Sequence, residues 1–564
     1  MTFTEYTYKR PQLEEVKAGF TNAINKFSEA KNVSEQVQAI DDINKLKNTL
    51  QTMFDLCYIR HSIDTNDEFY KEENDYINDF APLIEEYAIL FYQELINSSF
   101  RTELEEIYGS QLFRLAEVQQ KTFSPEIIPL LQKENKLSSE YSRLIASAKI
   151  DFQGEERTLA QLKPFMENPD RSIRQAASEA YFGFLAANED ELDQLFDQLV
   201  KVRHEIATTL GYKNFVELGY YRMNRTDYNA EMVANFRRQI EEDVVPIVTS
   251  LKQRQATRIG VDHLKYFDEG FEFQTGNAVP KGDAQWIIEN GKKMYTELSP
   301  ETKEFFDFMI EQQLMDLVAK KGKESGGYCT YLPDYKAPFI FSNFNHTADD
   351  IRVLTHEAGH AFQVHRSGNF SIPEYHWATF DASEIHSMSM EFITWPWMEL
   401  FFKEDTDKFK YSHLSSSLIF LPYGATVDEY QHFVYENPEA SPAERKEAWR
   451  SIEKKYLPHR NYDGNAFLEA GGNWQTQGHI YNSPFYYIDY VLAQICAFQF
   501  WKRSIENDPS AWNDYLHLCD LGGSKSFLEL VEAAQLQSPF KQGTVKAVIE
   551  TISDWLDAVD DKAL

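Results

Sequence analysis

The chain has 564 residues, enough for a large buried core and, by ordinary size scaling, for two or more subdomains. Its 56 basic and 89 acidic residues give a formal net charge of −33, which argues against nucleic acid or an anionic membrane as a partner. Hydrophobic residues make up 43% of the chain and aromatic residues 14%, which is typical of a folded globular protein.

Helical periodicity dominates the N-terminal part of the chain. Apolar residues recur at helical spacing over residues 16–27 and 37–57, and residues 80–118 continue in the same style. Residues 148–159 instead alternate around a Gln-Gly pair, which is typical of a β-hairpin. We therefore predict an N-terminal helical region over residues 1–160 and a second domain over residues 161–564.

The second domain is predicted to be mainly α with one small β-sheet. Helices are expected over residues 172–211 and 230–258, and the composition of residues 275–282 indicates a loop. Residues 326–331 and 337–344 have the pattern of short strands.

A pentapeptide, His356-Glu357-Ala358-Gly359-His360, carries the clearest chemistry. Residues i and i+4 share one face of a helix, so both imidazoles can bind a single ion. Glu357 would then hold a water bound to that ion and take its proton. Because a catalytic zinc keeps about three protein ligands and one open position, we expect one Zn²⁺ per chain.

The flanking sequence places this motif inside a helix. Thr347 and Asp350 have the spacing of a capping box, and Gly368 is a suitable end. Between them, apolar residues recur at helical spacing. We therefore predict a helix over residues 347–368 with Thr347 as its N-cap.

The third metal ligand is not fixed by the motif. A third histidine close behind the pair is missing, because Gln363 and Arg366 hold the positions concerned and His365 is one residue out of place. A carboxylate from a later element is therefore expected, and the candidates are Glu374, Asp381, Glu384, Glu391 and Glu399. Asp381, Glu384 and Glu391 share one face of a second predicted helix, over residues 380–391, so spacing leaves the choice open.

The motif at residues 356–360 indicates a zinc metallopeptidase, and in such an enzyme the strand at residues 337–344 can bind the substrate. Pro338 is typical of an edge strand, and a sheet edge can bind an extended peptide through main-chain hydrogen bonds. Ala337, Phe339 and Phe341 are therefore candidate substrate-binding residues. The same pattern also fits an ordinary structural strand.

A second constellation lies downstream and holds Gly471, Gly472, His479, Tyr486, Tyr487 and Tyr490. Peptide hydrolysis needs a hydrogen-bond donor for the oxyanion, and a phenol or a protonated imidazole can supply it. Clustered tyrosines are also common as amphipathic core residues. The glycine pair fits either a flexible loop that contacts substrate or a tight turn.

Cysteine usage and the N-terminal sequence bear on the compartment. The four cysteines (57, 329, 496 and 519) lie far apart and form no C-x-x-C pair, which fits buried thiols in a reducing compartment. Residues 1–30 contain no apolar signal core, and no run approaches the roughly 18 apolar residues of a membrane helix. We expect a cytoplasmic protein.

Three segments together resemble oligoendopeptidase F and the wider thimet oligopeptidase family of zinc peptidases. They are residues 335–344, the motif at 356–360 and residues 484–490, and the resemblance covers roughly residues 160–560. It implies a two-lobed zincin, gluzincin-like, with a deep substrate channel. It also implies a zinc-dependent endopeptidase that hydrolyses internal bonds of short oligopeptides, with collagen-derived peptides as candidate substrates because bacterial Pz-peptidases look like close relatives.

The resemblance also assigns individual residues. Glu384 matches the third zinc ligand of the family, Glu391 would orient a ligand imidazole, and Asp381 would lie beside them. His479 and Tyr490 match residues that stabilise the oxyanion and grip the substrate. Tyr486 and Tyr487 compete for one further role, and Ser483-Pro484 replaces a tyrosine of some members, so the main donor stays open.

Two alternatives remain from sequence. An exopeptidase that trims dipeptides from a C-terminus would use the same core with a basic residue for the substrate carboxylate. A non-catalytic, zinc-stabilised binding protein would normally close its site with four protein ligands, and the intact Glu357 argues against it.

Overall fold

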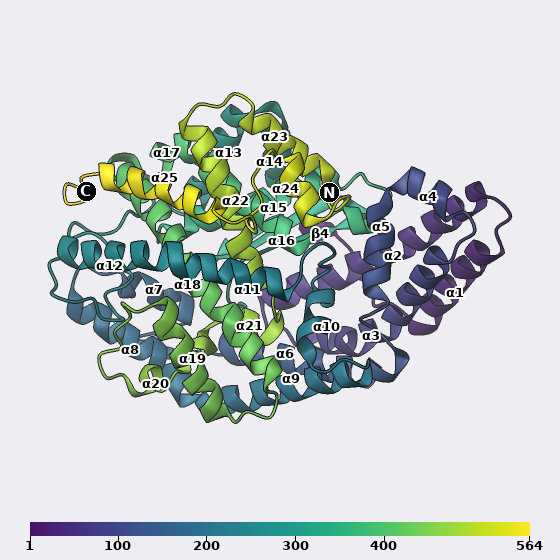
Figure 1. The fold of residues 1–564 in the computed structure, drawn as a ribbon, viewed down its shortest axis with the longest axis horizontal. Helices are drawn as coiled ribbons and strands as arrows, with labels where there is room; N and C mark the ends of the chain where they lie inside the picture. The colour runs from purple at the N-terminus through teal and green to yellow at the C-terminus, as the bar shows by residue number, and fades with distance from the viewer.

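The apolar stripes near the N-terminus fold into five helices that share a hydrophobic cluster of their own. The computed structural model describes residues 1–564. Residues between Phe20 and Ala116 form the cluster, and Ile372 and Tyr375 from the second domain insert into it. The helices lie at the right of Figure 1 and are α1 (Leu13–Glu29), α2 (Val33–Ile63), α3 (Glu68–Ile96), α4 (Arg101–Tyr108) and α5 (Ser110–Gln119).

The next part of the chain is helical apart from one hairpin. Gln153 and Gly154 have φ of +54° and +80°, the left-handed pair that a tight hairpin turn requires, so the predicted hairpin is confirmed. The elements are α6 (Ile128–Ala146), β1 (Ile150–Phe152), β2 (Glu155–Arg157), α7 (Leu159–Met166), α8 (Arg171–Ala187), α9 (Glu189–Thr209), α10 (Phe215–Arg222), α11 (Ala230–Gln239) and α12 (Val245–Ile259).

A three-stranded sheet precedes the helix that carries the histidine pair. Its strand order is β3-β5-β4, with β3 parallel and β4 antiparallel to β5. The elements here are α13 (Ala284–Leu298), α14 (Pro300–Glu311), β3 (Met315–Val318), β4 (Tyr328–Leu332), β5 (Ala337–Phe344), α15 (Asp349–Ser367), α16 (Phe380–Ile393) and α17 (Glu399–Phe402).

The expectation that residues 337–344 form an edge strand is wrong, because β5 is the central strand. Pro338 is tolerated there for a local reason. The Ile340 N–H donates to the Leu314 carbonyl on the β3 side, and Pro338, two residues earlier, faces the same side. The β3 pairing begins opposite Ile340, so the missing N–H of Pro338 leaves no ladder bond unmade.

The last part of the chain supplies the helices that close around the histidine pair. Helix α22 packs on α16 and on α18, and a Cβ at Gly424 of α18 would lie 2.2 Å from a methyl group of Val491. The elements are α18 (Thr406–Glu436), α19 (Pro442–Tyr456), α20 (Ala466–Glu469), α21 (Gly478–Asn482), α22 (Tyr487–Ile505), α23 (Ala511–Leu521), α24 (Phe527–Ala533) and α25 (Thr544–Ala558).

The fold is mainly α and two-lobed, with two small sheets. In Figure 1, α13–α16 and α22–α25 gather in the upper part, while α6–α9 and α19–α20 lie below them. One large core runs through both parts, from Phe3 to Leu556. The domain boundary near residue 160 stays a prediction.

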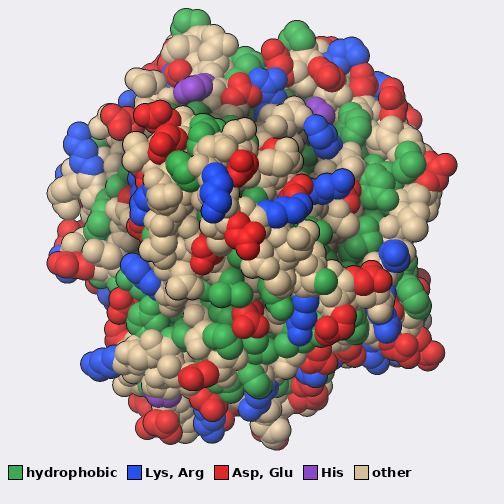
Figure 2. Space-filling model, turned by 90° about the vertical axis from the view of Figure 1, so that its right-hand side faces the viewer, with side chains coloured by type: hydrophobic (Ala, Val, Ile, Leu, Met, Phe, Trp, Pro, Cys, Tyr) green, Lys and Arg blue, Asp and Glu red, His purple; other side chains and the backbone are tan.

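The surface is strongly charged. Acidic and basic side chains are interspersed over the face in Figure 2, with apolar side chains between them. By length and hydropathy, none of the helices qualifies as a membrane span.

Candidate metal centre

Helix α15 carries the histidine pair, but it begins differently from the prediction. Its N-cap is Ala348, so the expected capping box with Thr347 as N-cap is wrong. The Thr347 hydroxyl donates instead to the Asn345 side chain at 2.8 Å. The Asp350 carboxylate accepts the N–H groups of Asn345 and His346 at 2.9 and 2.8 Å. Asp350 therefore holds the loop that leads from β5 into α15.

A glycine inside the motif brings the second helix close. A Cβ at Gly359 would lie 2.7 Å from the His386 carbonyl oxygen and 2.7 Å from the Ser387 Cα, both on α16. Any larger residue would push α16 away from α15. This close approach puts Glu384, on the same face of α16, beside both histidines.

The three expected ligands converge. His356 Nε2 and His360 Nε2 lie 3.2 and 3.3 Å from the same oxygen, Glu384 Oε2. Tetrahedral ligands at the roughly 2.0–2.1 Å bond lengths of zinc are separated by about 3.3 Å, so these spacings suit one shared ion. Glu384 is 1% exposed, and burial would raise its pKa, but the two imidazoles outweigh burial and hold the pKa well below its usual range.

The other candidate ligands do not reach the two histidines. Glu374 pairs with Lys47 at 2.6 Å, Glu399 is exposed, and His365 packs against Phe305. Asp381 accepts from the Ala382 N–H at 2.8 Å and makes no contact with a ligand histidine. The expectation that Asp381 supports the metal ligands is therefore wrong, because its carboxylate lies beside Tyr228 instead.

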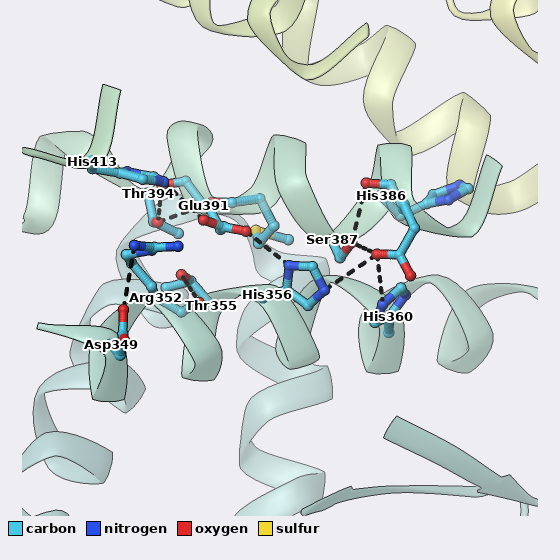
Figure 3. Close-up of polar contacts among 12 residues, drawn as sticks. Asp349, Arg352, Thr355, His356, His360, His386, Ser387, Glu391, Thr394 and His413 are labelled. Carbon is cyan, nitrogen blue, oxygen red and sulfur yellow. Dashed lines mark hydrogen bonds and ion pairs between the residues drawn. The ribbon is translucent and has the colours of Figure 1, made fainter. Parts of the chain in front are cut away.

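Glu391 lies between two imidazoles, as Figure 3 shows. One of its oxygens accepts from His356 Nδ1 and the other from His413 Nε2, each at 2.8 Å. The Trp395 indole N–H donates to His413 Nδ1 at 2.8 Å, so the proton of His413 is on Nε2 and points at Glu391. Glu391 therefore keeps the His356 proton on Nδ1, which leaves Nε2 free to bind a metal.

Sequence reasoning missed His413 and Trp395. Both are buried, and His413 stacks face to face on Phe392 at 4.5 Å between centroids. His413 lies in a serine-rich stretch of α18 far from the motif in sequence, so its type and spacing give no signal. Only the packing of α15, α16 and α18 brings the chain of hydrogen bonds together.

The general-base candidate Glu357 faces a cavity of about 490 Å³. It is 5% exposed, and its Oε2 has no hydrogen-bond partner. Burial raises the pKa of its carboxyl group, which opposes the lowering effect of the two histidines. A Cβ at Gly327, across the cavity, would lie 3.2 Å from Glu357 Oε1, so the backbone just before β4 lies close to the Glu357 carboxylate.

His479 and Tyr490 line the same cavity and hydrogen-bond to each other at 3.1 Å. The Tyr423 hydroxyl donates to Gln477 Oε1 at 3.1 Å, which turns the Gln477 amide N–H toward His479 Nδ1 at 2.8 Å. His479 therefore donates from Nε2 to Tyr490, and the Tyr490 O–H is free to donate into the cavity. Burial lowers the pKa of His479 to about 4, so the imidazole is neutral near pH 7 and not the protonated donor considered from sequence.

The side chains of Tyr486 and Tyr487 point to different places in the structure. The Tyr486 hydroxyl donates to Glu384 Oε1, and Tyr486 lines the cavity. Tyr487 is absent from the cavity wall and packs against Phe420 and Tyr423. Of the two competitors, Tyr486 is therefore the one beside the candidate metal ligands.

The free sheet edge beside the cavity belongs to β4. Gly327 to Thr330 line the cavity, whereas the side chains of Ala337, Phe339 and Phe341 are buried in the core. The prediction that β5 presents the substrate-binding edge is wrong, because β5 is paired on both sides. The sequence pattern identified the sheet but not the order of its strands.

The cavity continues in both directions along β4. At one end it shares Thr330 and Trp377 with a cavity of about 500 Å³, and at the other it shares Gly327 and Tyr328 with one of about 590 Å³. The three cavities therefore adjoin one another along β4, with Glu357 in the wall of the middle one.

Gly471 and Gly472 lie in a tight turn and do not line the central cavity. Gly471 has φ of +97°, and a Cβ there would lie 2.1 Å from the Lys446 carbonyl oxygen. A Cβ at Gly472 would lie 2.4 Å from the Phe467 ring. Packing explains both glycines, so the structure has the tight turn and not a loop that contacts substrate.

Comparison with known proteins finds similar peptidases. Residues 3–123 match the model of the peptidase M3 N-terminal domain, and residues 164–275 and 295–549 match peptidase family M3. A solved structure of Pz peptidase A with an inhibitor is 62% identical over the whole of both chains, with a TM-score of 0.99. A Bacillus anthracis protein assigned as oligoendopeptidase F is 62% identical over 100% of this chain and 99% of its own, with a TM-score of 0.95.

A more distant relative is the oligoendopeptidase F homolog of Borreliella burgdorferi. It is 25% identical over 372 residues, which are 64% of this chain and 61% of that protein.

Proposed function

The chain belongs to peptidase family M3 and is a metallopeptidase, and from this premise we propose that it is a zinc-dependent endopeptidase of short oligopeptides. One observation carries the proposal. His356, His360 and Glu384 converge beside Glu357 in a channel that runs along the free edge of β4.

The residues around the ligands suit a divalent cation. Three carboxylates, those of Glu357, Glu384 and Glu391, are buried there, and their mutual repulsion favours a positive ion among them. Two imidazoles and one carboxylate are a usual ligand set for catalytic zinc. A zinc ion held there would act as a Lewis acid toward the peptide carbonyl and lower the pKa of water to about 7.

Glu357 is the proposed general base. Its carboxylate lies in the cavity wall with one oxygen free of partners, so it can accept the proton of the attacking water. Its raised pKa brings it closer to the range in which a carboxyl group can also return a proton. The same group would then protonate the leaving amine.

Tyr490 is the proposed principal oxyanion donor, and Tyr486 is the proposed second donor, whose single O–H proton would turn from Glu384 to the oxyanion. Both hydroxyls lie at the cavity, and the neutral His479 holds the Tyr490 oxygen so that its proton points outward. A donor that is already oriented costs no reorganisation when charge develops on the carbonyl oxygen. His479 would thus act mainly through Tyr490.

The channel supports a preference for short, extended peptides. Main-chain groups of β4 can pair with a peptide regardless of its side chains, which suits an enzyme with many substrates. A folded protein would have to unfold before a strand could reach β4. We include collagen-derived peptides among the proposed substrates because of the similarity to Pz peptidase A.

The test uses a peptide blocked at both ends. The wild-type protein should cut it internally, whereas an exopeptidase that needs a free terminus would leave it intact. Glu357→Gln should keep one metal ion per chain and lose several orders of magnitude in kcat, because an amide cannot take the proton. More than about a tenth of wild-type kcat in that variant would place the base elsewhere.

A further inference from the structure

The residue just before Tyr486 has an unusual backbone. Phe485 has φ of +67°, in the left-handed region that bulky side chains avoid. It lies between the turn at Ser483 and the start of α22 at Tyr487. Such a conformation costs free energy and persists only when surrounding groups impose it, most often at functional sites.

Two buried side chains hold the main chain of Phe485. Its N–H donates to Gln431 Oε1 at 2.7 Å. Its carbonyl accepts from Arg225 Nη2 at 2.6 Å, and the same nitrogen donates to Asp489 Oδ1 at 2.6 Å. Arg225 therefore ties Phe485 to the first turn of α22. The exposed fractions of Arg225, Gln431 and Asp489 are 4%, 1% and 0%, so water does not compete for these bonds.

The side chain of Phe485 is equally confined. It is 0% exposed, and its ring fills the space beside Gly219, where a Cβ would lie 2.5 Å from a ring carbon. His432 and Tyr435 pack on its other sides, at 5.0 and 5.4 Å between ring centroids. The guanidinium of Arg225 lies 4.3 Å from the centre of the Tyr220 ring, which holds the cation in turn.

The held segment carries both proposed oxyanion donors. Tyr486 follows Phe485 directly, and Tyr490 lies one turn later on the same face of α22. Asp489, the second acceptor of Arg225, stands between them in sequence. A shift of the Phe485 carbonyl would therefore move the Tyr486 hydroxyl away from Glu384 and the cavity.

We propose that Arg225 and Gln431 are positioning residues, which hold Phe485 in its strained conformation and so keep the Tyr486 hydroxyl beside Glu384 at the cavity, where it can turn its proton to the oxyanion. This role rests on the proposed function, because it assigns Tyr486 as a donor. Neither residue touches the cavity itself, although Asn224, next to Arg225, lines it. The effect on catalysis must therefore pass through Tyr486.

A double-mutant cycle tests this role. Arg225→Met should lower kcat about tenfold or more, with KM and metal content within about threefold of wild type. Tyr486→Phe should cost about a hundredfold. The kcat of the double variant should lie within about threefold of that of Tyr486→Phe, because this substitution has already removed the hydroxyl that Arg225 positions.

A matched control separates positioning from general stability. Arg237→Met removes another arginine that pairs with a buried aspartate, Asp428, but makes no contact with residues 485–489. It should lower the melting temperature without lowering kcat more than about threefold. Equal kcat losses in Arg225→Met and Arg237→Met, or effects of Arg225→Met and Tyr486→Phe that multiply, would overturn the proposal.

Two further measurements keep the proposal open to failure. If Arg225→Met does not fold, Gln431→Met removes the acceptor of the Phe485 N–H and is judged by the same criteria. Hydrogen exchange needs no activity, and amides in residues 483–490 should exchange at least tenfold faster in either variant. Unchanged exchange would refute the proposal that Arg225 and Gln431 hold Phe485. An inactive wild-type protein would instead refute the proposed function.

Discussion

Replacing Glu391 by glutamine should weaken metal binding although Glu391 touches no metal. Both neighbours of this carboxylate, His356 Nδ1 and His413 Nε2, are donors in the structure. A glutamine offers one accepting oxygen and one donating NH₂ group, so one of the two imidazoles meets a donor. Trp395 fixes the proton of His413, and the conflict therefore falls on His356.

The magnitude follows from the proton that His356 must move. To accept from the glutamine, His356 has to carry its proton on Nε2, the nitrogen that points at Glu384 and would bind the metal. The protein then needs either a tautomer change or a lost hydrogen bond when metal binds. Losing such a support typically costs 10- to 100-fold in metal affinity, or about 1.4 to 2.8 kcal/mol.

The assay is a competition for zinc between the protein and a chelator of known affinity. Glu374→Gln is the matched control, because Glu374 is a nearby half-buried carboxylate of the same cavity that pairs with Lys47 and contacts no ligand imidazole. We expect its zinc affinity within threefold of wild type. The reasoning is refuted if Glu391→Gln keeps wild-type affinity, or if both variants lose the same amount.

Three further predictions follow from the channel and the core. Gly327→Ala puts a methyl group against Glu357 and should lower kcat about tenfold at unchanged metal content; Gly183→Ala, where a Cβ meets nothing within 4 Å, should not. In a ladder of blocked peptides from about five to forty residues, short ones should be cut fastest, and a folded protein should stay intact because unfolding it costs about 5 to 15 kcal/mol. Reduced casein, which is already unfolded, would contradict a narrow channel if it were cut as fast per bond as the best short peptide. Glu134 is buried, which raises its pKa, but two arginines outweigh this and lower it from 4.5 to about 2. Its stabilisation is therefore full above about pH 4.5 and lost toward pH 2, so the deficit of Glu134→Gln in urea unfolding should shrink from roughly 3 kcal/mol at pH 6 as the pH falls, and a constant deficit would contradict it.

Local patterns predicted most of the helices, because periodicity records which face of each helix is buried. The hairpin at Gln153 could also be predicted from local sequence, since its turn needs two residues in the left-handed backbone conformation. The order of the three-stranded sheet was not, because strand order depends on contacts between distant segments. Pro338 suggested an edge, yet the end of the β3 ladder made a central position possible.

The site likewise contains residues that local sequence predicts and residues that only tertiary packing brings together. The spacing of His356 and His360 follows from helix geometry alone, whereas Glu384 needed the resemblance to choose among several carboxylates on one helix face. No local pattern could assign His413 to Glu391, because the two meet only when α18 packs behind α16. The choice between Tyr486 and Tyr487 likewise depends on the strained backbone of Phe485, which no propensity would predict.

The most direct test of the central claim is a zinc titration of the metal-stripped chain, with internal cleavage of a doubly blocked peptide as the readout. We predict that stripping abolishes cleavage and that activity returns in proportion to added zinc, with its break at one ion per chain. Full cleavage without bound metal, or an ion that binds without restoring cleavage, would contradict a zinc-dependent endopeptidase built on His356, His360 and Glu384.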